Sequence, residues 1–81
     1  MSWFFNLFRR KKTYKLFFKG VHHATQRAKT PKEALKYFLK RYGATFENIR
    51  PLLVYFDTDY FEDFEITDGK KWWMIDDIMQ G

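Results

Sequence analysis

The chain contains no cysteine, which excludes disulfide bonds and thiolate metal sites. Its only serine is Ser2, so neither a Ser–His nor a Cys–His pair has a nucleophile within the body of the sequence. The four glycines stand apart at positions 20, 43, 69 and 81, and no glycine-rich phosphate loop is present. We therefore expect a protein that is not an enzyme and that holds no cofactor.

Long apolar runs are also missing. The longest is Leu52–Phe56, whereas a helix needs roughly 20 apolar residues to cross a membrane. The N-terminus does not resemble a secretory signal, because its basic residues follow its apolar ones. From these features we expect a cytoplasmic protein.

Groups that could hold a metal ion are few. His22 and His23 are neighbours, and neighbouring side chains on a strand point to opposite faces, so the pair cannot readily share an ion. The acidic stretch 57–63 begins like a calcium loop, but Phe61 occupies the fifth position and Glu62 the position that requires glycine. We predict no metal site.

The chain does have many aromatic residues and an uneven charge. Aromatic residues make up 22% of its 81 residues, enough to build a core in one small domain. Residues 1–50 hold thirteen basic and two acidic side chains, whereas residues 51–81 hold two basic and eight acidic ones. This asymmetry predicts either two differently charged faces or halves that neutralise each other.

The clearest local pattern predicts a helix over residues 31–42. Thr30 is suited to cap it, Pro31 to open it and Gly43 to end it. Alternation predicts a half-buried strand at 13–21 and a more polar edge strand at 24–29. The run Leu52–Phe56, apolar on both faces, predicts a strand in the middle of the sheet.

Asp68-Gly69 predicts a hairpin between strands at 60–67 and 70–76. A two-residue turn pairs Glu65 with Trp72 and Phe64 with Trp73, so the two tryptophans lie on opposite faces. The apolar face then contains Phe64, Ile66, Trp73 and Ile75, and the opposite face contains Asp63, Glu65, Trp72 and Met74. A one-residue bulge would exchange part of this assignment.

Together these elements predict an α+β domain over residues 13–81, in the order β-β-α-β-β-β, with one helix on a mainly antiparallel sheet of about four to five strands. Residues 1–12 form a separate N-terminal segment. Over residues 15–42, carried by Ala28 and the helix start at 30–35, the order resembles small phage inhibitors of bacterial RNA polymerase and some small archaeal ribosomal proteins. This resemblance implies a fold and no function.

Three surfaces are candidates for binding. The first, and our primary hypothesis, is a protein-docking site typical of a regulatory or adaptor protein such as an inhibitor. In it an exposed tryptophan and a methionine lie between acidic residues, as interface hot spots do. The residues of this site are Trp72, Met74, Asp63 and Glu65.

The second candidate is a nucleic-acid or ribonucleoprotein site. Basic residues beside an aromatic ring suit single-stranded nucleic acid, although a lysine row is also typical of a solvated helix face. Its residues are Lys15, Phe17, Lys19, Lys32, Lys36 and Lys40.

The third candidate is peripheral attachment to a membrane through the N-terminal segment. Its apolar side chains could lie in the headgroup region above the basic block, or they could instead cover an open end of the core. The residues are Trp3, Phe4, Leu7, Phe8, Arg9 and Arg10.

Overall fold

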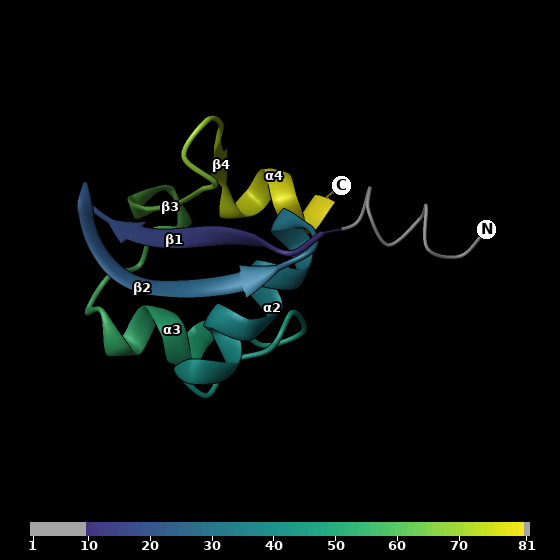
Figure 1. The fold of residues 1–81 in the computed structure, drawn as a ribbon. Helices are drawn as coiled ribbons and strands as arrows, with labels where there is room; N and C mark the ends of the chain where they lie inside the picture. Colours follow the sequence, from purple (N-terminus) through teal and green to yellow (C-terminus); the bar gives the residue numbers. More distant parts are fainter. Residues whose placement is uncertain (1–9, 81) are drawn as a thin grey trace.

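Four antiparallel strands form one sheet in the order β2-β1-β3-β4, and the computed structural model describes residues 10–80 of the chain (Figure 1). Helices α2 and α3 lie together beside β2, and α4 follows β4 at the other edge (Figure 1). The α+β class and the antiparallel sheet predicted from the sequence are confirmed. The elements are β1 (Lys12–Phe18), β2 (Val21–Ala28), α2 (Pro31–Arg41), α3 (Arg50–Tyr55), the 3-10 turn η1 (Phe61–Asp63), β3 (Phe64–Thr67), β4 (Trp72–Met74) and α4 (Ile75–Gln80).

The β1–β2 hairpin turns at Lys19 and Gly20, which have φ values of 48° and 80°. Positive φ at both central residues matches the turn that follows the natural twist of two strands. The pairing shifts between Leu16 and Phe17, so that β2 contains one extra residue, a bulge. Strand β2 lies at the edge of the sheet, as its polar sequence predicts.

Helix α2 has the predicted start and end. The Thr30 hydroxyl accepts a hydrogen bond from the Glu33 N–H at 3.1 Å, and Gly43 follows the helix with a φ of 77°. At the C-terminal end the Arg41 guanidinium donates to the Thr25 carbonyl oxygen at 2.8 Å. This bond joins the helix to the outer edge of β2.

The prediction of a central strand at Leu52–Phe56 is wrong, because this stretch forms helix α3 instead. Five apolar residues in a row have no period, and such a run fits a buried strand or a helix equally well. Pro51 occupies the first turn of α3, where its missing N–H costs nothing. Only Leu52 is fully buried, whereas Val54 and Tyr55 are exposed. The element order is therefore β-β-α-α-β-β followed by α4.

The two-residue turn predicted at Asp68-Gly69 is also wrong. Thr67 pairs with Trp72, and the connection contains the four residues 68–71. The Asp68 carboxylate builds this turn, because its Oδ1 accepts from the Lys70 N–H at 2.8 Å and from the Lys71 N–H at 2.9 Å. The pairing shifts by two residues from the prediction, so the side chains of β3 and β4 keep their predicted faces.

Both predicted strands of this hairpin are shorter than the sequence suggested. Residues 61–63 form η1, and β4 ends at Met74, where α4 begins. Ile75 and Ile78 are spaced three residues apart, which puts both on the buried side of a helix. Ile75 is buried as predicted, but it belongs to α4 and not to a strand.

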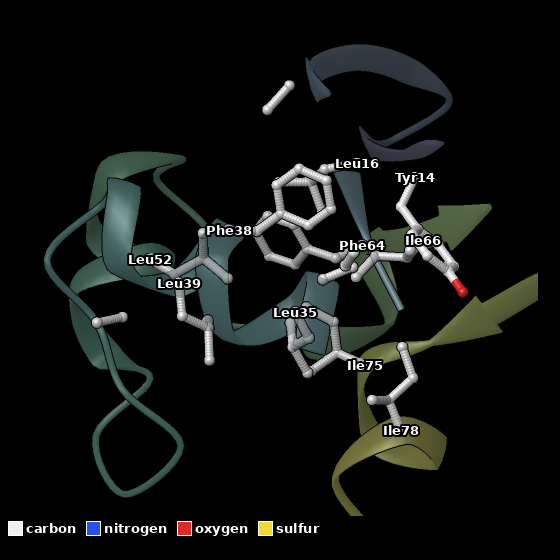
Figure 2. Close-up of a cluster of buried hydrophobic side chains, with 14 residues drawn as sticks. Tyr14, Leu16, Leu35, Phe38, Leu39, Leu52, Phe64, Ile66, Ile75 and Ile78 are labelled. Carbon is white, nitrogen blue, oxygen red and sulfur yellow. The ribbon is translucent and has the colours of Figure 1, made fainter. Parts of the chain in front are cut away.

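The hydrophobic core lies on one face of the sheet, under α2, α3 and α4. Side chains from all three helices meet those of β1 and β3, and the Tyr14 hydroxyl points away from them (Figure 2). Trp73 packs against the edge of this cluster, with its ring centroid 6.1 Å from that of Tyr14. The largest fully buried side chains are Tyr14, Phe38, Phe64, Leu16, Leu35, Leu39, Leu52, Ile66 and Ile75.

Candidate binding surface

The second face of the sheet carries the side chains that alternate with the core. We call this surface the outer sheet face. The helices described between residues 10 and 80 pack on the core face instead, through the buried residues of α2, α3 and α4. Strand alternation and the observed pairing place on the outer sheet face Thr13, Lys15, Phe17, His22, Thr25, Arg27, Glu65, Thr67, Trp72 and Met74.

Trp72 is the most prominent side chain of this surface, with 55% of its area exposed. Its ring meets that of Phe17 edge to face, with the centroids 5.0 Å apart. Phe17 in turn lies 5.5 Å from the His22 ring. Thr67 also belongs to this face but is only 4% exposed. Its strand lies between those of Phe17 and Trp72, and the two rings meet above it.

Hydrogen bonds fix the loop 68–71, which directly precedes Trp72. The Thr67 hydroxyl donates to the Lys71 carbonyl oxygen at 2.7 Å and accepts from the Gly69 N–H at 3.0 Å. The buried hydroxyl is thus satisfied, and it ties the loop 68–71 to the end of β3. Trp72 follows that loop directly, so the hydrogen bonds of the loop restrain the backbone of Trp72.

The charges on and around the outer sheet face are mixed. Lys15 and Arg27 supply two cations, and Glu65 supplies an anion from β3. Asp68 lines a hollow of this surface together with Lys15 and Trp72, and its side chain is only 7% exposed. Hydrogen bonds from the backbone N–H groups of Lys71 and Lys70 lower the pKa of Asp68, and the ammonium of Lys12 at 3.8 Å acts in the same direction.

Three of the four residues predicted for protein docking come together on this surface: Trp72, Met74 and Glu65. The fourth, Asp63, does not. It lies in η1, where its carboxylate accepts a hydrogen bond from the Thr58 hydroxyl and its carbonyl oxygen accepts from the Lys19 N–H. The predicted strand extended back across this turn, so Asp63 was assigned to a strand in which it does not lie.

The residues predicted for nucleic acid do not form one site. Lys15 and Phe17 lie on the outer sheet face beside Trp72. Lys19 lies in the β1–β2 turn, with its ammonium 5.5 Å from the Phe18 ring. The helix lysines are exposed on α2, which packs on the core face of the sheet. They are Lys32, Lys36 and Lys40.

Sequence reasoning missed four polar residues of the outer sheet face: Thr13, Thr25, Arg27 and His22. The first three follow from continuing the alternation of β1 and β2. His22 does not, because the bulge that brings it opposite Phe17 leaves no mark in the sequence. The prediction that His22 and His23 point to opposite faces is confirmed. The His23 ring lies 4.9 Å from that of Phe56, whereas His22 meets Phe17.

Five of the six residues predicted for membrane attachment, Trp3 to Arg9, lie outside the described residues, and Arg10 is exposed. Between residues 10 and 80, no helix has the length and apolarity needed to cross a membrane. The same part of the chain contains no group of three or more His, Asp or Glu side chains placed to hold a metal ion.

The chain was compared with known proteins by sequence and by structure. No protein-family model, curated protein or solved structure matches it.

Proposed function

We propose that this protein is a non-enzymatic regulatory or adaptor protein that docks on a protein partner through the outer sheet face. The observation that carries the proposal is Trp72, which is 55% exposed, packed edge to face on Phe17 and surrounded by polar side chains. Tryptophan is enriched among residues that dominate interface energies, and a polar rim around it excludes water in a complex.

The charge of the surface favours protein over nucleic acid. A phosphate backbone is bound by a surface on which cations clearly outnumber anions. Here Glu65 stands against Lys15 and Arg27, and Asp68 is paired with Lys12, so the cations exceed the anions by only one. A protein partner can meet both signs at once, which sets its orientation on the surface.

The anchor is also held in place before binding. The Phe17 ring limits where the Trp72 ring can lie, and the bonded loop 68–71 limits its backbone. Immobilising a free side chain on binding costs about 0.5–1.5 kcal/mol, and this cost falls when the side chain is already restrained. Met74 lies next along the same face of β4 and can adapt to an irregular partner surface.

We test the proposal with Trp72→Ala and a matched control. The partner is first isolated with the unaltered protein, and its affinity is then measured for each variant. Trp72→Ala is expected to weaken binding by about 2 kcal/mol, roughly thirtyfold. Tyr60→Ala removes a ring that is 65% exposed elsewhere, and it is expected to leave the affinity unchanged. Equal affinity of the Trp72→Ala variant and the unaltered protein would contradict the proposal.

We further propose that the protein works in the cytoplasm. The chain has no cysteine, so its fold needs no oxidising compartment. A fluorescent fusion observed in cells of the source organism tests this location, and accumulation at a membrane would contradict it.

A further inference from the structure

Helix α2 carries three lysines in a row on the side that faces away from the core: Lys32, Lys36 and Lys40. All three are exposed, whereas Ala34, Leu35, Phe38 and Leu39 of the same helix are buried. With 1.5 Å of rise per residue, successive lysines lie about 6 Å apart along the helix axis. The row therefore presents a line of positive charge that winds by about 40° around the helix at each step.

An apolar groove runs beside this row. Lys36 and Lys40 form one wall, and the segment that follows α2 forms the other. That segment is fixed in place, because the Ala44 N–H donates to the Leu39 carbonyl oxygen at 2.8 Å and the Asn48 N–H donates to the Thr45 hydroxyl at 3.0 Å. Phe46 is half-buried in the groove, and Ala44 is almost fully buried.

The lysines of this groove have no ion-pair partner among residues 10–80, where the one ion pair joins Lys12 to Asp68. Glu33 is the only acidic residue of α2, and its carboxylate accepts a hydrogen bond from the Lys29 N–H at 3.0 Å. The groove therefore combines an apolar floor with positive charge that this part of the chain leaves without a paired anion.

We propose that this groove binds an acidic peptide segment of a partner protein, with one apolar side chain of the segment inserted against Phe46. An extended peptide places every second side chain on the same side, about 6.6 Å apart. This repeat is close to the lysine repeat of about 6 Å, so alternate carboxylates can meet successive lysines. The site is separate from the outer sheet face, and the inference does not depend on the proposed function.

The shape of the groove favours a peptide over single-stranded nucleic acid. Single strands are held by phosphate contacts together with bases stacked on open ring faces. The one ring that lines the groove, that of Phe46, is half-buried, and the Lys32 ammonium lies 5.9 Å from its centre. Glu47 also lines the groove, on the wall opposite Lys36 and Lys40, and it repels carboxylates as well as phosphates, so the bound acidic segment lies against the lysines.

The test measures binding of a fluorescent peptide that alternates glutamate with threonine and carries one central tryptophan. A second peptide has glutamine in place of every glutamate. We expect the acidic peptide to bind and the glutamine peptide to bind at least tenfold more weakly. Added salt is expected to weaken the acidic complex, because exposed charges are screened within about 10 Å at 0.1 M salt.

The matched variants are Lys36→Glu with Lys40→Glu, against Lys70→Glu with Lys71→Glu. Both pairs change the net charge equally and alter only exposed side chains. The first pair is expected to weaken the acidic peptide about tenfold or more, and the second to leave it within twofold. Trp72→Ala is expected to have no effect, which separates this site from the proposed docking surface.

Three results would overturn the inference. The first is absence of acidic-peptide binding. The second is equal loss of binding with both pairs of reversals. The third is tighter binding of a single-stranded oligonucleotide that the reversals at Lys36 and Lys40 abolish, which would assign the groove to nucleic acid.

Discussion

The outer sheet face and the lysine groove differ in how their charges arise. On the outer sheet face, each of the four strands contributes two or three side chains, and the cations of β1 and β2 share the face with the anion of β3. In the groove a single helix repeats lysine every four residues, so one sign dominates. From residue 10 onward, the basic half of the sequence therefore does not form one basic face, because the fold places Lys15 and Arg27 on the outer sheet face and the lysine row on α2, which packs on the core face.

The two surfaces also differ in how their aromatic side chains are placed. Trp72 stands on the sheet with more than half of its area exposed, whereas Phe46 is half-buried in a groove. An exposed, restrained ring suits insertion into a pocket of a partner. A half-buried ring beside a hollow suits the reverse arrangement, in which the partner provides the inserted side chain. The comparison predicts two distinct modes of recognition.

The largest expected effect is on stability, and it distinguishes the buried face of β4 from the exposed one. Trp73 packs against the core beside Tyr14, so Trp73→Ala is expected to lower the free energy of unfolding by about 3 kcal/mol. Trp72→Ala is expected to lower it by less than about 1 kcal/mol, because its ring is more than half exposed. Chemical denaturation of the two variants measures the difference. Equal losses would mean that both faces of β4 are buried.

An intermediate effect is expected when the N-cap of α2 is compared with its exposed face. Thr30→Ala removes the hydroxyl that accepts from the Glu33 N–H, and it is expected to cost about 1 kcal/mol. Lys36→Ala removes an exposed side chain of the groove and is expected to stay within about 0.5 kcal/mol. Thermal or chemical unfolding compares them. A large loss of unfolding free energy in Lys36→Ala would show that Lys36 stabilises the fold. The lysine row would then not be free to bind a ligand.

The smallest expected effect is on the turn that carries Trp72. Backbone hydrogen bonds lower the pKa of Asp68 in the folded state below its unfolded value of about 3.9. The carboxylate therefore stabilises the fold above that value, and the stabilisation is lost as the pH falls through the lower, folded pKa. Asp68→Asn keeps an acceptor oxygen but does not titrate.

The measurement is the free energy of unfolding of both proteins between about pH 6 and pH 2. The unaltered protein is expected to lose more stability than the Asp68→Asn variant over this range. Parallel curves would show that the Asp68 carboxylate contributes no charge-dependent bond to the turn.

The sequence predicted those elements whose local signals agree with one another. Thr30 and Pro31 mark the start of α2 and Gly43 its end, and this helix was predicted correctly. The alternation of residues 13–21 predicted β1, although the strand ends at Phe18, before the turn at Lys19 and Gly20. Residues 52–56 have no period, and their structure was decided by packing against the core. A helix there could not be distinguished from a strand.

Part of the candidate site was predicted correctly because of the way in which the hairpin register was wrong. The error in the hairpin was two residues, and an even shift leaves the side chains of β3 and β4 on their faces. Trp72, Met74 and Glu65 were therefore placed correctly by a pairing that was itself wrong. That Phe17 and Lys15 share this surface depends on β1 pairing with β3, a contact between residues almost fifty apart that no local signal predicts.

The accessibility of Trp72 in the free and bound protein tests the central claim most directly. A variant with Trp3→Phe and Trp73→Phe leaves Trp72 as the only tryptophan, and acrylamide quenching of its fluorescence reports the exposure of the ring. We expect strong quenching in the free protein, and marked protection once a tryptophan-free form of the partner is bound. Quenching that stays unchanged while binding is demonstrated independently would contradict docking through the outer sheet face.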